Sequence, residues 1–102
     1  MGAFTTIAVN NTGGFVCSFF LKAVADGEAW SVESGNYPAP NVHTVQIPVD
    51  ATSITLSVHG EGFTGWKHLH DQTWDDTSGW NTSGLAFLVY GTAGDMKCSE
   101  TQ

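Results

Sequence analysis

Positive charge is what the sequence has least of. It contains no arginine and three lysines against ten acidic residues, which gives a formal net charge of −7. Nucleic acids are held largely through their phosphates by lysine and arginine, so a chain of this composition would be repelled. Anionic membranes, nucleotides and phosphosugars are disfavoured for the same reason. We therefore expect no nucleic-acid partner and a ligand that is neutral or cationic.

Long hydrophobic runs are also missing. The longest, Phe15 to Val24, is interrupted by Ser18 and Lys22, so no segment is long and apolar enough to cross a bilayer. The first residues, MGAFTTIAV, lack the basic start and long apolar stretch of a signal peptide. The expected location is therefore open between the cytoplasm and secretion after removal of a leader. The hydrophobic share of 41% is typical of a folded chain, and we expect one domain over residues 1–102.

Cysteine is scarce, with one residue near each end of the chain, Cys17 and Cys98. If the chain is exported or handled in air, the two are expected to form a disulfide. The bond would stabilise the fold by roughly 4 kcal/mol in the chain-entropy model. The alternative is two free thiols, and the sequence leaves both open. Cysteines so far apart do not make a zinc ribbon.

A long helical period is absent, and short alternating apolar segments take its place. Alternation predicts strands at residues 4–9, 15–24, 28–34, 42–48, 53–59 and 85–91, with a short last strand at 96–98. Gly, Asn and Pro separate these segments, as between the strands of all-β proteins. The predicted fold is therefore all-β, an antiparallel β-sandwich or small barrel of six to eight short strands. The predicted core contains Phe15, Phe19, Leu21, Trp30, Val45, Ile47, Ile54, Leu56, Val58, Phe87 and Val89.

The segment TTIAVNNTGGFVCSFFLKAVADGEAW, about a quarter of the chain, resembles the beginning of several small β-sandwich proteins. Actinoporin-like cytolysins, fungal fruit-body lectins and aegerolysins each begin with a strand, an Asn/Thr/Gly-rich turn and a long second strand. The similar residues here are Ile7, Val9, Asn11, Thr12, Gly13 and Trp30. The resemblance implies a sandwich that recognises sugars or lipids, and it assigns no site residue. The amphipathic N-terminal helix of the cytolysins has no counterpart in this sequence.

Residues 65–84 form the most unusual segment, because this apparent loop holds three of the four tryptophans. If its start is extended, Trp66, His68 and His70 share one face, and Leu69 turns to the core on the other. The candidate ligand-binding residues are Trp66, His68, His70, Asp71, Trp74, Asp75, Asp76, Trp80 and Asn81.

Tryptophan and aspartate together suit a neutral sugar. An indole face packs on the C–H patch of a pyranose, while carboxylates and amides bond its hydroxyl groups. We therefore predict a carbohydrate-binding, lectin-like protein that recognises a neutral glycan or glycoconjugate. A shallow site of this kind binds weakly, so we expect a homo-oligomer that gains avidity.

Three alternatives to a sugar site stay open for the same segment. The tryptophans can close one end of the sandwich, with no ligand. They can instead lie at a bilayer interface, where indole is favoured, as in a cytolysin-like protein that binds membrane lipid. A purely structural or partner-binding role is the third.

Metal binding and catalysis are less well supported. His68 and His70 are half of a transition-metal site that Asp71 or His59 could extend. Calcium held by Asp71, Asp75 and Asp76 as a structural ion is a further alternative, although the spacing is not that of an EF-hand. The neighbouring acids Asp75 and Asp76 face opposite ways on a strand and do not make a glycosidase pair. We expect no required cofactor and no enzymatic activity.

Overall fold

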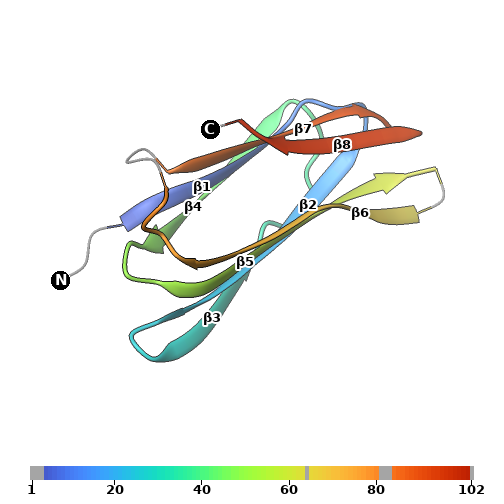
Figure 1. Cartoon of the computed structure of the whole chain (residues 1–102). Coiled ribbons are helices and arrows are strands. Elements are labelled where there is room, and N and C mark those ends of the chain that lie inside the picture. The colour runs from blue at the N-terminus through green and yellow to red at the C-terminus, as the bar shows by residue number, and fades with distance from the viewer. Residues whose placement is uncertain (1–3, 64, 81–83, 102) are drawn as a thin grey trace.

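A computed structural model describes residues 4–63, 65–80 and 84–101, which form two four-stranded sheets packed face to face (Figure 1). The strands are β1 (Phe4–Asn11), β2 (Val16–Ala25), β3 (Glu28–Glu33), β4 (Asn41–Pro48), β5 (Thr52–Gly62), β6 (Gly65–Asp76), β7 (Leu85–Thr92) and β8 (Asp95–Glu100). None of the described residues is helical, so none forms a helix that could span a membrane. The all-β prediction is confirmed.

The first sheet has the strand order β4-β1-β7-β8 and the second the order β3-β2-β5-β6. Neighbouring strands are antiparallel with one exception, the parallel pair of β1 and β7, which sets Ile7 beside Leu85. Both sheets are open at their edges, so the molecule is a sandwich and not a closed barrel.

The prediction of a loop over 65–84 was wrong for its first part. Residues Gly65–Asp76 form β6, which at 12 residues is the longest strand. The segment lacks the simple apolar alternation of a core strand because β6 is an edge strand, hydrogen-bonded to β5 alone. Polar and charged side chains are common on edge strands, where they discourage pairing with other chains.

The core lies between the two sheets and follows the predicted alternation. Of the predicted core residues, Trp30 and Val45 are partly buried against the core and the others are fully buried. Seven further buried residues complete it: Ile7, Val9, Cys17, Ala23, Tyr37, Ala51 and Leu85. The predicted inward face of residues 15–23 is confirmed at every second position.

Asn11 and Tyr37 tie the loops at one end to the core, and neither role could be predicted from the sequence pattern. The buried Asn11 amide donates to the carbonyl oxygens of Phe15 (2.8 Å) and Tyr37 (3.2 Å), and its Oδ1 accepts from the Gly13 amide (3.0 Å). The Tyr37 hydroxyl donates to the carbonyl oxygen of Val9 (2.9 Å). Tyr37 comes from a segment that its prolines mark as a loop, yet it is 4% exposed.

The β5–β6 and β7–β8 hairpins point in the same direction, away from the N-terminal end of β1 (Figure 1). Their turns are in close contact, because a Cβ on Gly62 would lie 2.6 Å from the Ala93 carbonyl oxygen and 2.9 Å from the Met96 Cε. Only glycine fits at Gly62 without a shift of the β7–β8 turn. We call the four residues Phe63, Trp66, Ala93 and Met96 the hairpin tip.

Candidate functional site

A β-bulge in β6 decides where the side chains of the Trp/His/Asp segment lie. Val58 of β5 pairs with His70, but its neighbour His59 pairs with His68, which leaves Leu69 as the extra residue. The alternation of faces therefore reverses between His68 and His70. The prediction that His70 faces outward with Trp66 and His68 was wrong for this reason.

On the inner side of β6, His70, Trp74 and Trp80 form an aromatic layer over Phe87. Ring centroids of His70 and Phe87 are 5.2 Å apart, and those of Trp74 and Phe87 are 6.2 Å apart. Trp74 and Trp80 meet edge to face at 5.2 Å, and both are partly buried against the core. His70 Nε2 shares a hydrogen bond of 2.8 Å with Gln72 Oε1. Two of the three tryptophans thus close the space between the sheets, which was the alternative to a sugar platform.

On the outer side of β6, Trp66, His68 and Asp71 face solvent. The rings of His68 and His59 are in contact, tilted by 44° with centroids 4.4 Å apart, and His68 Nε2 lies 3.7 Å from Asp71 Oδ1. The Asp71 carboxylate also accepts a hydrogen bond of 2.7 Å from the Ser57 hydroxyl, which lowers its pKa. Burial and the neighbouring His68 lower the pKa of His59 below its usual value.

The remaining candidates lie apart from these two groups. Asp75 is exposed farther along β6. Asp76 ends the strand, and its carboxylate accepts hydrogen bonds from the Ser78 amide and hydroxyl, which lower its pKa. Asn81 lies outside the described residues. The nine candidates are therefore not brought together into one pocket, and their role in ligand binding stays a prediction.

The zinc alternative needed His68 and His70 on one face, and the bulge places them on opposite faces. Within the described parts of the chain, no three His, Cys, Asp or Glu side chains are arranged to hold a metal ion. The carboxylates of Asp71 and Asp76 instead accept hydrogen bonds from nearby serines.

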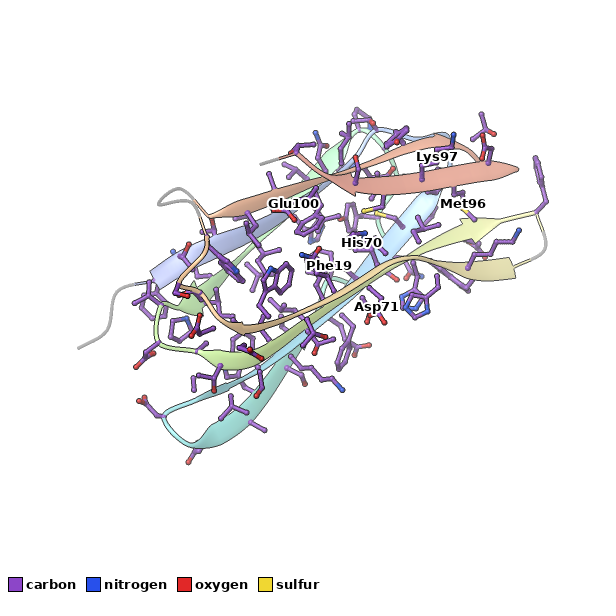
Figure 2. The ribbon with its side chains drawn as sticks, viewed as in Figure 1. Phe19, His70, Asp71, Met96, Lys97 and Glu100 are labelled. Atoms are coloured by element: carbon purple, nitrogen blue, oxygen red, sulfur yellow. The ribbon has the colours of Figure 1, made fainter. Side chains whose placement is uncertain are left out.

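The hairpin tip is the most exposed apolar feature of the described chain. Phe63 is 87% exposed and Trp66 is 44% exposed. The Phe63 ring reaches the β7–β8 turn, where a Cβ on Gly94 would lie 3.3 Å from its Cε2 atom. Lys97 lies on β8 near the tip (Figure 2). Its ammonium Nζ lies 3.6 Å from Asp95 Oδ2, so the negative charge of Asp95 is partly neutralised. Phe63 was not among the predicted site residues, although an aromatic residue between two glycines of a predicted turn, Gly62 and Gly65, is a usable signal.

Cys17 on β2 and Cys98 on β8 come from different sheets, and both are free thiols in the structure. Burial raises the pKa of Cys98 to about 12 and also raises that of Cys17. The charge of Cys17 adds to the rise in the pKa of Cys98. The burial expected of Cys17 is confirmed, and a disulfide on air oxidation stays a prediction.

Solved structures of bacterial toxins share this fold. A Gram-negative toxin is 14% identical with a TM-score of 0.72, and the match covers 98% of this chain and 23% of that one. Listeriolysin O is 14% identical with a TM-score of 0.71, and the match covers 98% of this chain and 22% of listeriolysin O. Suilysin from Streptococcus suis is 13% identical with a TM-score of 0.71, and the match covers 99% of this chain and 24% of suilysin. No known protein family matches the sequence, and no curated protein is detectably similar.

These likenesses show the fold, a β-sandwich of the kind found as one part of larger toxins. The chain spans less than a quarter of the length of each of these three. The coarse resemblance to cytolysin-type sandwiches is confirmed in this sense. The comparisons lend no support to carbohydrate binding.

Proposed function

We propose that the protein binds membranes of neutral lipid through the hairpin tip. The observation that carries the proposal is the 87% exposed side chain of Phe63 at the turn of the β5–β6 hairpin. Trp66 of the same hairpin is 44% exposed. Structural likeness to toxins, among them the cytotoxin suilysin, supports a membrane target over a soluble one. This function needs no catalytic group, so it agrees with the expectation that the protein is not an enzyme.

Transfer of two aromatic side chains, Phe63 and Trp66, from water into the bilayer interface would drive the binding. Full burial of a side chain such as phenylalanine is worth about 1.5–3 kcal/mol, and indole is favoured at the interface. With a net charge of −7, anionic lipid would repel the chain, so we expect neutral headgroups to be preferred. Two aromatics give weak binding, and several copies on one vesicle would raise it by avidity.

The test is co-sedimentation with vesicles of zwitterionic phosphatidylcholine, prepared alone, with sterol and with sphingomyelin. We expect the wild-type chain to bind at least one of these and the double variant Phe63→Ser, Trp66→Ala to bind it about tenfold or more weakly. Addition of phosphatidylserine is expected to reduce binding at low salt.

The matched control is Phe4→Ser. Phe4 is 62% exposed, but it begins β1 at the opposite end of the sandwich (Figure 1). Its loss is expected to leave vesicle binding unchanged. Wild-type binding that the tip variant keeps in full, or no binding to any of the three vesicles, would contradict the proposal.

A further inference from the structure

The outer face of the β3-β2-β5-β6 sheet carries an aromatic side chain at its centre. Strand register sets Phe20 of β2 beside Glu33 of β3 on one side and Ser57 of β5 on the other, and Ser57 pairs in turn with Asp71. An outer sheet face is usually polar and solvated. Phe20 is half-buried in the middle of this face.

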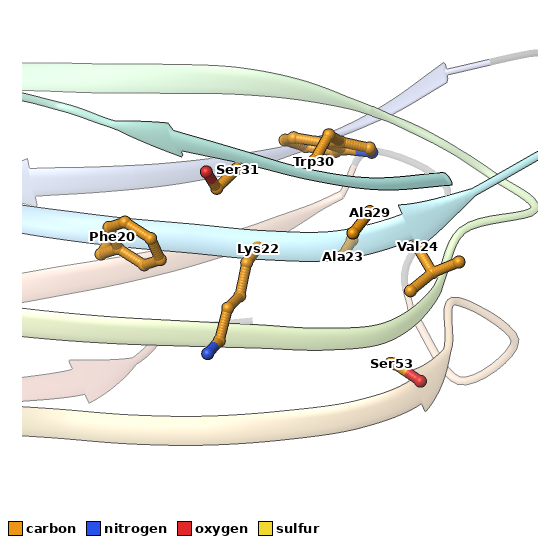
Figure 3. Close-up of a pocket in the computed structure, with 8 residues that line it drawn as sticks. All are labelled: Phe20, Lys22, Ala23, Val24, Ala29, Trp30, Ser31 and Ser53. Atoms are coloured by element: carbon orange, nitrogen blue, oxygen red, sulfur yellow. The ribbon is translucent and has the colours of Figure 1, made fainter. Parts of the chain in front are cut away.

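Two hollows flank Phe20, and its side chain lines both. The hollow toward the hairpin tip has a volume of about 460 Å³ and is lined by Phe20, Glu33, Asn36, Ser57 and His59, among others. The second has about 330 Å³ and lies on the Lys22 side, where Phe20 and Lys22 both project from β2 (Figure 3). Small-ligand pockets commonly have about 300–1,000 Å³. We call the two hollows, together with the Phe20 side chain that lines both, the trough.

The polar groups around Phe20 offer both hydrogen-bond donors and acceptors. Glu33 carries a carboxylate and Asn36 an amide. Burial, the main cause, and His68 keep the pKa of His59 low, so its neutral imidazole can donate through one nitrogen and accept through the other. The Ser57 hydroxyl is oriented by its bond to Asp71.

Charge limits what the trough can hold. Among the described residues, Lys22 is the only lysine that lines it. Glu33 lines it from the neighbouring strand, and Asp71 accepts a hydrogen bond from Ser57. An anionic ligand would meet two carboxylates and a chain with a net charge of −7. A metal ion lacks a set of three ligands among the described side chains. A neutral ligand with a flat apolar face and a rim of hydroxyl groups fits both the ring and the polar groups.

We propose that this trough is a binding site for a neutral oligosaccharide, with one pyranose ring packed on Phe20 and its hydroxyl groups bonded by Glu33, Asn36 and His59. The site is separate from the hairpin tip and from the tryptophans of residues 66–80. The same sugar chemistry could come from a free glycan or from the headgroup of a glycolipid.

The experiment has two arms, an array of neutral and sialylated glycans and phosphatidylcholine vesicles that carry a neutral glycosphingolipid. We expect a neutral hit on the array and weaker or no binding to its sialylated form. Binding to free glycan identifies a soluble source, and binding only in the vesicle arm identifies a headgroup. Both outcomes support the site when Phe20→Ala weakens them about tenfold or more.

Two further variants distinguish a loss of binding from a loss of folding. Phe20→Trp keeps a ring and should retain binding, and Glu33→Gln should weaken it without loss of shape. The control is Thr44→Ala, an exposed position on β4 of the other sheet. No binding to the array or to the vesicles would overturn the proposal. Binding that Trp66→Ala abolishes and Phe20→Ala leaves intact would also overturn it. Neither Phe63 nor Trp66 lines the trough, so a failure of the tip variant Phe63→Ser, Trp66→Ala and a failure of the sugar site are distinguishable.

Discussion

At the scale of single residues, Asn11 holds the end of the sandwich where the hairpins project. Its side chain satisfies two buried carbonyl oxygens and one amide that come from the β1–β2 turn and from the segment before β4. Buried backbone groups without partners are costly, so one amide fixes two loops at once.

We expect Asn11→Ala to lower the free energy of unfolding by about 3 kcal/mol, because the Phe15 carbonyl and the Gly13 amide lose their partner. The Tyr37 carbonyl loses one of its two hydrogen bonds and keeps the one from the Cys17 amide. Equilibrium unfolding in urea measures this. The neighbouring Asn10 is exposed on the other face of β1, and Asn10→Ala should change stability by less than about 0.5 kcal/mol. Equal losses in the two variants would contradict the role of Asn11.

At the scale of strands, the fold class and core could be predicted from the sequence and the position of the site could not. Phe19, Leu21 and Leu56 follow strict alternation, so burial is visible in their spacing. The bulge at Leu69 depends on pairing with β5, which no local pattern of β6 encodes. One inserted residue turned His70 from the solvent face to the core.

The bulge also sets His68 on His59 and so makes stability depend on pH. The pKa of His59 is lower in the folded chain, chiefly through burial and then through His68, so the unfolded chain takes up the proton more readily. This contributes nothing well above pH 6.5 and destabilises the fold as pH falls through that value. Between pH 7.5 and 5, we expect His59→Gln to lose less stability than the wild type in urea titrations. An identical loss in both would be evidence against this effect.

At the scale of the whole molecule, the two sheets are separate layers that meet through apolar side chains. Cys17 and Cys98 lie on strands of different layers. The rate at which their thiols react therefore depends on how tightly the two sheets pack. The sequence predicted two layers, but it could not show which strands lie in the same sheet.

Both thiols should react slowly in the folded protein, because burial raises the pKa of Cys98 to about 12 and raises that of Cys17 as well. With freshly reduced protein at pH 8, we expect slow labelling by a disulfide reagent in buffer and rapid labelling of two thiols in denaturant. Protein aged in air should show none in denaturant if the predicted disulfide forms. Fast labelling of native protein would mean that the layers separate readily.

The parallel pairing of β1 with β7 has a consequence for synthesis on the ribosome. β1 emerges before β2, yet the strand that covers one of its edges, β7, follows only after β2 to β6. Until then that edge of β1 is an open template for pairing with another chain. Contacts so distant in sequence also carry a large loop-closure entropy and slow the folding of β-proteins. We therefore expect β1 to be among the last strands completed, and the nascent domain to be most prone to aggregation just before β7 emerges.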